Sequence, residues 1–411
     1  MVASCMRTVS SSQAVDTQSQ LIVLASGTGY DGFLVIDSLQ NNTSSGGVRI
    51  APDLMLEEVQ NLAREMTMKF ALFRLPRGGA KAGLRIPADL SVSARRRALE
   101  AFGRQIGPII RAGLYYPGMD MNCGPEDLQT IYMGAGLSIG WPTDSSYFTA
   151  VSAANAIEGC AQALGGPRPM TLAIDGFGSV ARHLAVMLSP SEFIITAVST
   201  VCGAIVNPEG FLQEDLDRNK REHGDEMIRH LSGAPIPLKD LLSARADILV
   251  PSARTWALTE DVARRIRARA VVPIANAPYS PGTIRILFDR GVLCLPGYLC
   301  NAGGVFGSSL ADNGVSRADI EQMFRLRYRP LIRGLLDACI RRHLSPVIVV
   351  DEMAGREADS RATRVTKASF PHKLYARTAR YLPRMVKKQS IWRQCQRAFD
   401  AMEHDFSLVG T

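Results

Sequence analysis

Two lysines and one aspartate have residue types and surroundings that suit proton transfer beside a bound molecule. Lys81 lies among small residues in the run Arg77-Gly-Gly-Ala-Lys-Ala-Gly83, and Lys69 precedes it by twelve residues. Desolvation and a second nearby cation both disfavour an ammonium ion, so the pKa of Lys81 would fall toward neutrality. Such a lysine can act as a general base or hold a reacting carbonyl. The alternatives are a solvated surface lysine and, for Asp120, an ordinary turn aspartate.

A glycine turn provides a second candidate site. The run Gly176-Phe-Gly-Ser-Val-Ala181 follows an apolar strand and opens a helix. Gly176 permits a tight turn, Gly178 lets the backbone approach a pyrophosphate, and Ala181 allows close packing of helix on strand. The helix N-terminus would face the phosphates. The sequence therefore predicts a dinucleotide site that includes Gly176, Phe177, Gly178, Ser179 and Val180.

The end of the next strand bears on which dinucleotide binds there. An acidic residue at this position usually accepts hydrogen bonds from the adenosine ribose. Here the strand 193–199 runs into Thr200, which carries no carboxylate. A hydroxyl repels a 2′-phosphate less than an aspartate would, so the sequence favours NADP slightly over NAD. No arginine stands at that position to bind the phosphate, and loose cofactor specificity is the alternative.

The elements around these residues predict an α/β fold. Apolar strands alternate with helices after Trp141, which is typical of a doubly wound, parallel Rossmann sheet. The earlier part mixes short strands and helices with a glycine-rich loop over 77–83 and a turn over 115–120. From about Gln322 the pattern is helical. The predicted domains are 1–145, 146–320 and a helical, basic C-terminal segment 321–411, with residues 1–20 as a frayed leader.

Composition narrows the class of protein. The 411 residues are enough for two domains, and 46% hydrophobic with 21% charged residues is typical of a globular chain. No apolar run approaches the roughly 20 residues that a membrane-spanning helix needs, and the start lacks the layout of a signal peptide. Eight scattered cysteines form no Cys-x-x-Cys pair or Cys/His cluster. We therefore expect no metal site, no disulfide framework, no membrane contact and a cytoplasmic location.

The net charge of +8 is unevenly distributed. Residues 321–411 carry 18 Lys and Arg against 9 Asp and Glu, a net charge of +9, so the remaining residues sum to −1. The excess includes Arg325-Leu-Arg-Tyr-Arg, Arg341-Arg342 and Lys387-Lys388. A solvated helical surface or a subunit contact is the favoured interpretation, and a polyanion-binding face is the alternative. Nucleic acid is not expected as a partner.

The motifs in this order resemble the Glu/Leu/Phe/Val amino-acid dehydrogenase family. The similarity extends from about Asp31 to Ser308 and is closer to the glutamate branch than to the leucine or phenylalanine branch. The runs that carry it are Gly46-Gly-Val-Arg-Ile-Ala-Pro-Asp53, Leu75-Pro-Arg-Gly-Gly-Ala-Lys81, Pro117-Gly-Met-Asp120, Ala275-Asn276-Ala-Pro and Asn301-Ala-Gly-Gly-Val305. The resemblance implies an N-terminal substrate and oligomerisation domain, a Rossmann domain for NAD or NADP, and a site in the cleft between them. It also implies a homo-oligomer that interconverts a 2-amino acid with a 2-oxo acid and ammonia.

The resemblance also implies roles for particular residues. Lys69 would bind the substrate α-carboxylate, and Lys81 would be the low-pKa lysine that activates water or polarises the carbonyl. Asp120 would shuttle a proton to and from the nitrogen. Asn276 and Asn301 would position the nicotinamide and the substrate carboxylate. Further contacts are implied for Thr149 and Ala275 with the cofactor, and for Ser45, Gly46, Gly47 and Ser308 with the substrate.

Some positions depart from the family pattern. Glutamate enzymes have a lysine before the Gly-Gly pair, where this chain has Ser45, and Ser308 is a poor substitute for an ammonium group. Because the loss of a charged partner for a buried carboxylate costs several kcal/mol, we predict that glutamate is not the preferred substrate. A neutral, polar or aromatic 2-amino acid is expected instead. Phe70, Ser152 and Gly297 also depart, which leaves a catalytically silent, nicotinamide-binding regulatory or scaffolding homologue as the alternative.

Overall fold

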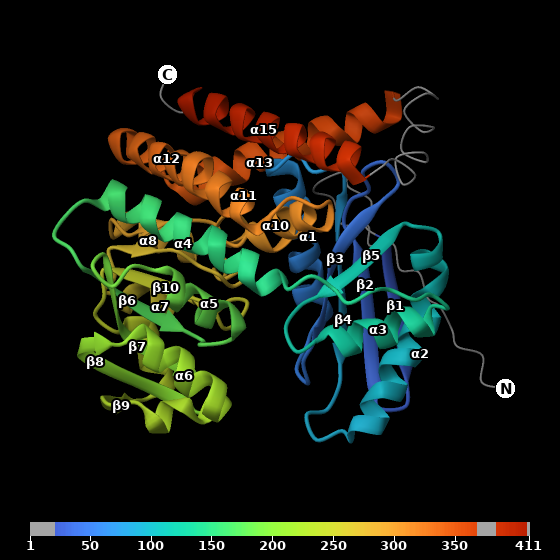
Figure 1. Cartoon of the computed structure of the whole chain (residues 1–411), viewed down its shortest axis with the longest axis horizontal. Helices are drawn as coiled ribbons and strands as arrows, with labels where there is room; N and C mark the ends of the chain where they lie inside the picture. Colours follow the sequence, from blue (N-terminus) through green and yellow to red (C-terminus); the bar gives the residue numbers. More distant parts are fainter. Residues whose placement is uncertain (1–20, 368–383, 409–411) are drawn as a thin grey trace. The chain divides into compact units, whose positions relative to one another are not determined.

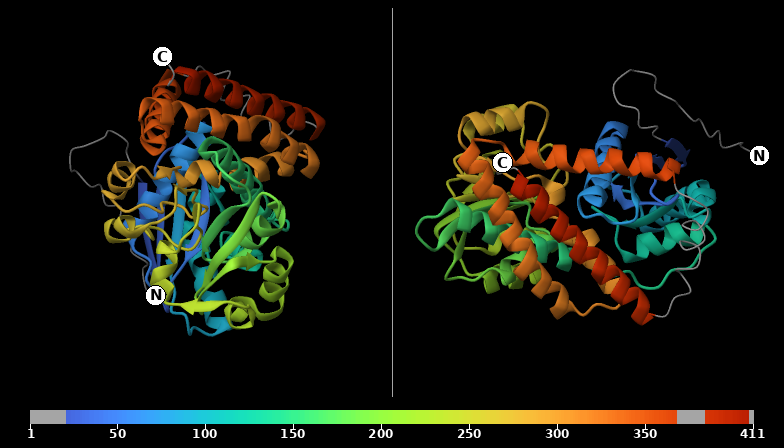
Figure 2. Two further views of the ribbon diagram at one scale, coloured as in Figure 1. Left: turned by 90° about the vertical axis from the view of Figure 1, so that its left-hand side faces the viewer. Right: turned by 90° about the horizontal axis from the view of Figure 1, so that it is seen from above.

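The structure is a computed structural model that describes residues 21–367 and 384–408, and Figures 1 and 2 show its ribbon. The chain divides into two units. The first holds the described residues up to Thr143 and those from Ala354 within helix α13 (Pro346–Lys367). The second holds Asp144–Met353 and the described residues from Arg384 onward. The predicted leader, residues 1–20, lies outside the described residues, and the predicted domain limits stay predictions.

The first unit is built on a five-stranded sheet in the order β1-β2-β4-β3-β5. Strand β4 is central, antiparallel to β2 and parallel to β3, and β3 is parallel to β5. Helix α1 packs on one face, where Val59 and Ala63 join the apolar side chains of β2. Helices α2 and α3 cover the other face. The elements are β1 (Leu21–Gly27), β2 (Tyr30–Ile36), β3 (Ser44–Ile50), α1 (Leu56–Leu72), β4 (Gly78–Arg85), α2 (Val92–Arg111), β5 (Tyr115–Met119) and α3 (Pro125–Gly134).

Two predicted irregular segments are strands in the structure. The expected loop over 77–83 lies almost entirely within β4, and most of the expected turn over 115–120 is β5. The glycines of β4 do not end the strand, because they make room for a neighbouring element. A Cβ built on Gly79 would lie 2.1 Å from the backbone nitrogen of Thr67, so α1 can approach β4 only where the strand has no side chain.

The second unit is built on a seven-stranded sheet in the order β12-β11-β10-β6-β7-β8-β9. Strands β12, β11, β10, β6 and β7 are parallel, as predicted, whereas β8 and β9 are antiparallel. Only Val201 and Cys202 separate β7 from β8, and a two-residue connection can join only antiparallel strands. The strands are β6 (Met170–Asp175), β7 (Phe193–Thr200), β8 (Gly203–Phe211), β9 (Ala234–Ile236), β10 (Ile248–Pro251), β11 (Ala270–Val271) and β12 (Leu293–Cys294).

Helices complete the second unit and give it the predicted α/β architecture (Figure 1). The long apolar helix α4 packs against α5, α10 and α12. The helices are α4 (Ser145–Leu164), α5 (Ser179–Met187), α6 (Gln213–His223), η1 (Gly224–His230), η2 (Leu238–Ser243), α7 (Glu260–Arg265), α8 (Thr283–Asp289), α9 (Gly297–Cys300), α10 (Gly303–Asp312), α11 (Arg317–Met323), η3 (Phe324–Tyr328), α12 (Arg329–Arg342) and α15 (Arg384–Leu408). Among the described residues, no helix is both long and apolar enough to span a membrane.

Basic residues of the C-terminal segment take part in intramolecular pairs. Arg327 bonds Asp400 at 2.7 Å, which ties η3 to α15. Arg329 pairs with Glu158 on α4, and Arg361 pairs with Glu357 at 2.8 Å. These pairs favour a structural use of the positive charge over a polyanion-binding face. The side chains of Lys387 and Lys388 lie outside the described residues.

Candidate active site

One face of the first sheet gathers the polar residues of the candidate site. Because side chains alternate along a strand, paired residues of neighbouring strands point to the same face. Ser45 on β3 pairs with Gly79 on β4 and with Tyr116 on β5. Arg49 lies four residues after Ser45 on β3, and Lys81 lies two residues after Gly79 on β4, so both point to this same face. Asp120 comes directly after β5. The sheet therefore brings together residues that are far apart in the sequence.

Asp120 is the centre of a buried ion cluster. Its Oδ2 atom accepts hydrogen bonds from Lys81 Nζ at 3.0 Å and from Arg49 Nε at 2.8 Å. The other end of the Arg49 guanidinium donates to Glu58 Oε1 at 2.7 Å. No described residue donates to Oδ1 of Asp120. Lys81 and Arg49 therefore both bind Oδ2 of Asp120, and Oδ1 is available to a ligand.

The environment of the cluster shifts the pKa of each member. Burial lowers the pKa of Lys81, Asp120 opposes this effect, and Arg49 lowers the pKa further. Burial alone would raise the pKa of Asp120, but the nearby charges of Arg49 and Lys81 bring it below its usual range. Asp120 is therefore a carboxylate at neutral pH, and Lys81 loses its proton more readily than a lysine in water.

Lys69 is a second buried ammonium group, in the last turn of α1. Burial lowers its pKa to about 8, with Glu65 opposing and Lys81 adding to the shift. The helix is fixed to the sheet by short polar contacts. Thr67 on α1 donates to Asp37 Oδ2 at 2.5 Å, and its hydroxyl lies 2.7 Å from Ser38 Oγ, which accepts from the backbone nitrogen of Gly79 at 2.9 Å. The lowered pKa expected for Lys81 is thus accompanied by one at Lys69 that the sequence did not predict, and each lysine lies within electrostatic reach of Asp120.

Ser45 lies beside an aromatic residue and a cation that the sequence reasoning missed. Its hydroxyl donates to the backbone oxygen of Tyr116 at 2.9 Å. The guanidinium of Arg77 lies over the Tyr116 ring, 4.9 Å from its centroid. The available signal was the arginine that directly precedes the Gly-Gly pair of β4. A lysine is absent at position 45, but a different cation reaches the same end of the sheet face.

The predicted substrate residues Gly46 and Gly47 act through their small size and their backbone. A Cβ on Gly46 would lie 1.6 Å from the backbone oxygen of Ala80, and one on Gly47 would lie 2.7 Å from Cβ of Asp120. The same Cβ would lie 2.6 Å from the backbone oxygen of Met119, so any side chain at Gly47 would displace the end of β5 together with Asp120. The backbone oxygen of Gly46 accepts a hydrogen bond from Tyr115 at 2.8 Å, which fixes β3.

In the second unit, the predicted glycine turn joins β6 to α5. Gly176 has φ +92°, and a Cβ there would lie 2.7 Å from Ala253, so this position requires glycine. A Cβ built on Gly178 would have no atom within 4 Å, so there is open space in front of the N-terminus of α5. The side chain of Phe177 is buried in the core. Its predicted cofactor contact is therefore restricted to the backbone, as expected for a turn that presents amide groups to a pyrophosphate.

Two acidic residues contact the end of β7, Asp225 through its backbone oxygen and Glu226 through its carboxylate, and the sequence reasoning missed both. Thr200 donates to the backbone oxygen of Asp225 at 2.6 Å, and Cys202 Sγ donates to Glu226 Oε1 at 3.3 Å. Both acids come from η1, 25 residues along the chain from the strand, so no local spacing rule could reveal them. Each is also paired with a cation, Asp225 with Lys220 and Glu226 with Arg229, both at 2.5 Å.

The predicted asparagines are bonded to each other. Asn301 Nδ2 donates to Asn276 Oδ1 at 2.7 Å and to the backbone oxygen of Ile274 at 2.9 Å. Asn301 Oδ1 and Ser308 Oγ are buried polar atoms with no hydrogen-bond partner among the described residues. An unpaired buried acceptor is costly, and a bound ligand can satisfy it. The hydroxyl of Thr149 instead donates to the backbone oxygen of Ser145 at 2.7 Å.

Two departures from the family pattern have a structural role. Ser152 donates to the backbone oxygen of Cys300 at 2.8 Å and accepts from the nitrogen of Gly303 at 2.9 Å, so it braces both sides of Asn301. Gly297 lies against the segment after β11 that holds Ala275. A Cβ on Gly297 would be 2.5 Å from the backbone oxygen of Ala275, so the residue allows this close approach.

Comparison with known proteins agrees with this geometry. The profile of the Glu/Leu/Phe/Val dehydrogenase dimerisation domain matches residues 21–135, and the Glutamate/Leucine/Phenylalanine/Valine dehydrogenase profile matches residues 140–322. The chain belongs to this amino-acid dehydrogenase family. The first match includes Lys69 and the ion cluster around Asp120, and the second includes the glycine turn, Asn276 and Asn301. The resemblance predicted from the sequence is therefore confirmed.

Individual relatives place the chain within this dehydrogenase family. A glutamate dehydrogenase of Thermotoga maritima is 36% identical over 295 residues, which cover 67% of this chain and 70% of that protein. Among solved structures, the hetero-hexameric glutamate dehydrogenase of Thermus thermophilus in its leucine-bound form has a TM-score of 0.71 at 23% identity, covering 83% of this chain and 86% of that one. The L-tryptophan dehydrogenase of Nostoc punctiforme has a TM-score of 0.56 at 20% identity, covering 85% and 97%. These structural likenesses show the shared fold.

Proposed function

We propose that the chain catalyses the reversible oxidative deamination of a 2-amino acid. The amino acid, water and oxidised NAD(P) would give a 2-oxo acid, ammonia and reduced NAD(P). The observation that carries the proposal is the buried cluster in which Lys81 and Arg49 share one oxygen of Asp120. A buried lysine whose pKa is lowered beside a specific charged partner is typical of a functional site. Membership of the dehydrogenase family supports the same reaction.

Each residue of the cluster has a distinct role in this reaction. Lys69 binds the α-carboxylate as a point charge. Asp120 accepts a hydrogen bond from the substrate nitrogen through its free Oδ1. Neutral Lys81 takes the proton of the attacking water and, in its ammonium form, stabilises negative charge on the carbonyl oxygen. Because Asp120 stays ionised, Lys81 is the group that holds the proton, and Asp120 orients the substrate nitrogen.

The second unit would hold the cofactor. Gly176, Gly178 and the α5 N-terminus would bind the pyrophosphate, and Asn301 Oδ1 would accept a hydrogen bond from the nicotinamide or the substrate. When bound, the nicotinamide takes the hydride from the α-carbon. The NADP preference predicted from Thr200 is not what we propose, because a 2′-phosphate at the end of β7 would meet Asp225 and Glu226. We propose that NAD is preferred, since its ribose hydroxyls can donate to those carboxylates.

The substrate side chain would meet the end of the sheet face that holds Ser45, Tyr116 and Arg77. Ser45 already donates its hydroxyl proton to a backbone oxygen, so it offers only lone pairs to a ligand. The Tyr116 ring stacks with Arg77 and presents a flat apolar surface. This combination supports a 2-amino acid with a neutral polar or aromatic side chain rather than glutamate. The glutamate dehydrogenase relatives make glutamate the alternative, and Arg77 is the cation that would then bind its side-chain carboxylate.

The assembly would be a homo-oligomer built through the first unit, which matches a dimerisation-domain profile. The hetero-hexameric relative makes a mixed assembly with a second family member the alternative. A catalytically silent subunit is the second candidate for this chain. The retained Lys69, Lys81 and Asp120 favour the enzyme over it, since a silent subunit has no use for buried lysines of lowered pKa.

A substrate panel tests the proposed reaction. Reduced cofactor is followed by its near-ultraviolet absorbance while ammonia and each of a series of 2-oxo acids are supplied with NADH or NADPH. We expect turnover with at least one neutral 2-oxo acid, and loss of that turnover in Lys81→Ala with cofactor binding unchanged. Lys239→Ala, an exposed lysine on η2, is the matched control and should keep full activity. Cofactor binding without turnover on any oxo acid would favour the silent subunit.

A further inference from the structure

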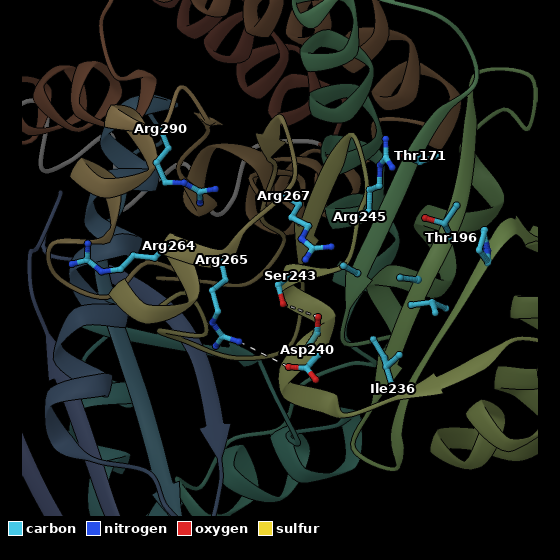
Figure 3. Close-up of a pocket in the computed structure, with 14 residues that line it drawn as sticks. Thr171, Thr196, Ile236, Asp240, Ser243, Arg245, Arg264, Arg265, Arg267 and Arg290 are labelled. Carbon is cyan, nitrogen blue, oxygen red and sulfur yellow. Dashed lines mark hydrogen bonds and ion pairs between the residues drawn. The ribbon is translucent and has the colours of Figure 1, made fainter.

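The second unit contains a pocket that the proposed reaction does not use. It has a volume of about 1060 Å³, and its lining comes from β6, β7, β8, β9, η2, the end of α7 and the residue after α8 (Figure 3). Thr171 is near the start of β6, while Arg245 and Arg267 each come three residues before the parallel strands β10 and β11. The glycine turn follows the other end of β6. Strand β6 therefore separates the two places by roughly 16 Å.

The lining of this pocket is strongly basic. Five of its fourteen residues are arginines, and Asp240 is the only acidic one. Within the part of the chain that the structure describes, neither Arg245 nor Arg267 has a carboxylate within ion-pair distance. Arg265 pairs with Asp261 at 3.2 Å and reaches Asp240 at 3.9 Å, so its charge is partly compensated. Like charges gathered in one concave surface repel one another unless an anion compensates them.

Two further features suit a particular class of anion. The guanidinium of Arg290 donates to the backbone oxygens of Ala263 and, at 2.6 Å, Ile266, so its position is fixed without loss of charge. The opposite wall is apolar and is formed by Ala197, Val206 and Ile236. Arginines match phosphate oxygens with paired N–H donors, whereas a flat apolar wall offers a surface for a ring.

We propose that this pocket binds a nucleoside triphosphate at a site separate from the dinucleotide turn. The phosphate chain would lie against Arg245, Arg267 and Arg265, and the base would lie on the apolar wall. In Figure 3 the side chains of Arg267 and Arg265 lie near Ser243, whereas that of Arg245 extends toward the top of the view. Arg264 extends away from this group in the figure and is paired with Glu260 at 3.3 Å. It therefore contributes only to the positive electrostatic potential of the pocket. The volume exceeds what a phosphate ion alone would fill.

Calorimetric titration of the full chain with ATP tests the site. NADH is kept in excess so that the dinucleotide turn is filled and ATP cannot bind there. We expect ATP to bind, and the double variant Arg245→Gln/Arg267→Gln to weaken binding by about 30-fold, since each arginine supplies a charge-assisted pair. Arg245→Lys/Arg267→Lys keeps the charge and should restore part of the loss. Arg285→Gln/Arg333→Gln removes the same charge from exposed pairs elsewhere and should bind like the wild type.

Several results would overturn the proposal. Complete displacement of ATP by NADH would place it at the dinucleotide turn. Equal affinity in the Arg245→Gln/Arg267→Gln variant would remove the pocket from consideration. Inorganic phosphate binding as tightly as ATP would mean an adventitious ion only, and tripolyphosphate binding as tightly would refute a nucleoside site. NADH binding and melting temperature confirm that each variant is folded. The dehydrogenase assay runs without ATP, so its outcome is independent of this one.

Discussion

Arg49 offers the sharpest test of how the cluster tunes Lys81. Arg49 Nε and Lys81 Nζ bond the same oxygen of Asp120 at 2.8 and 3.0 Å. The two nitrogens are therefore at most about 5.8 Å apart, and at an effective dielectric constant of about 20 their repulsion is roughly 3 kcal/mol, or about 2 pKa units. Delocalisation of the guanidinium charge reduces this figure. Replacing Arg49 by methionine should raise the pKa of Lys81 by about 1 to 2 units.

The pH dependence of kcat/KM for oxidative deamination measures this change. The reaction needs neutral Lys81, so the rate rises with pH through the pKa of Lys81, and Arg49→Met should move this rise to higher pH. Loss of Arg49 also strengthens the hold of Asp120 on the Lys81 ammonium, which shifts the pKa in the same direction. Arg49→Lys keeps the charge and should leave the profile near that of the wild type. An unchanged rise, or one displaced to lower pH, would refute the assignment of Lys81 as the titrating base.

Arg49→Met also removes the partner of two acidic groups, so the folded state must be checked. Arg49 is buried, and removal of one partner from a buried ion pair costs about 3–5 kcal/mol because the remaining charge is uncompensated. The profile is therefore measured well below the melting temperature of the variant. Arg49→Lys again serves as the comparison, because it should lose less stability.

Three further predictions concern substrate, cofactor and the asparagine loop. Ser45→Lys should raise kcat/KM for 2-oxoglutarate at least tenfold relative to a neutral 2-oxo acid, since an ammonium group becomes available for the distal carboxylate. If the wild type already prefers 2-oxoglutarate and Arg77→Gln abolishes that preference, Arg77 supplies the charge and our assignment of a neutral substrate is wrong. Glu226→Gln should improve kcat/KM with NADPH about three- to tenfold relative to NADH, because a negative charge is removed beside a 2′-phosphate; an unchanged ratio would place the ribose elsewhere. Ser152→Ala should cost about 1–3 kcal/mol of unfolding free energy and raise the cofactor KM, because Gly303 N and Cys300 O lose their partner; a loss of stability with an unchanged KM would make Ser152 a purely structural brace.

Local patterns in the sequence predicted some of the elements that hold the candidate site. The glycine turn depends on a strand, a tight turn and a helix that are contiguous in the chain, and the structure places Gly176 and Gly178 as predicted. The lysines were recognised from the small residues around Lys81. The pairing of β3, β4 and β5 was missed because glycines usually indicate a turn or loop. In this chain the glycines of β4 lie inside the strand and allow α1 to approach it.

Contacts between distant segments account for the other omissions. Arg49 lies in a run that resembles the family, but its bond to Asp120 joins residues 71 positions apart. Arg77, just before β4, reaches Tyr116 on β5 because both strands pair with β3. Asp225 and Glu226 reach the end of β7 from η1, which no spacing rule relates to that strand. Such contacts follow from strand order, which the sequence does not state.

Transfer of the substrate α-hydrogen to the cofactor tests the central claim most directly. A 2-amino acid that carries deuterium at the α-carbon is incubated with the protein and oxidised cofactor, and the reduced cofactor is analysed by mass spectrometry. The account predicts one deuterium on the nicotinamide ring with the wild type and none with Lys81→Ala, which still binds cofactor. Cofactor binding without deuterium transfer from any 2-amino acid, or transfer that persists in Lys81→Ala, would contradict it.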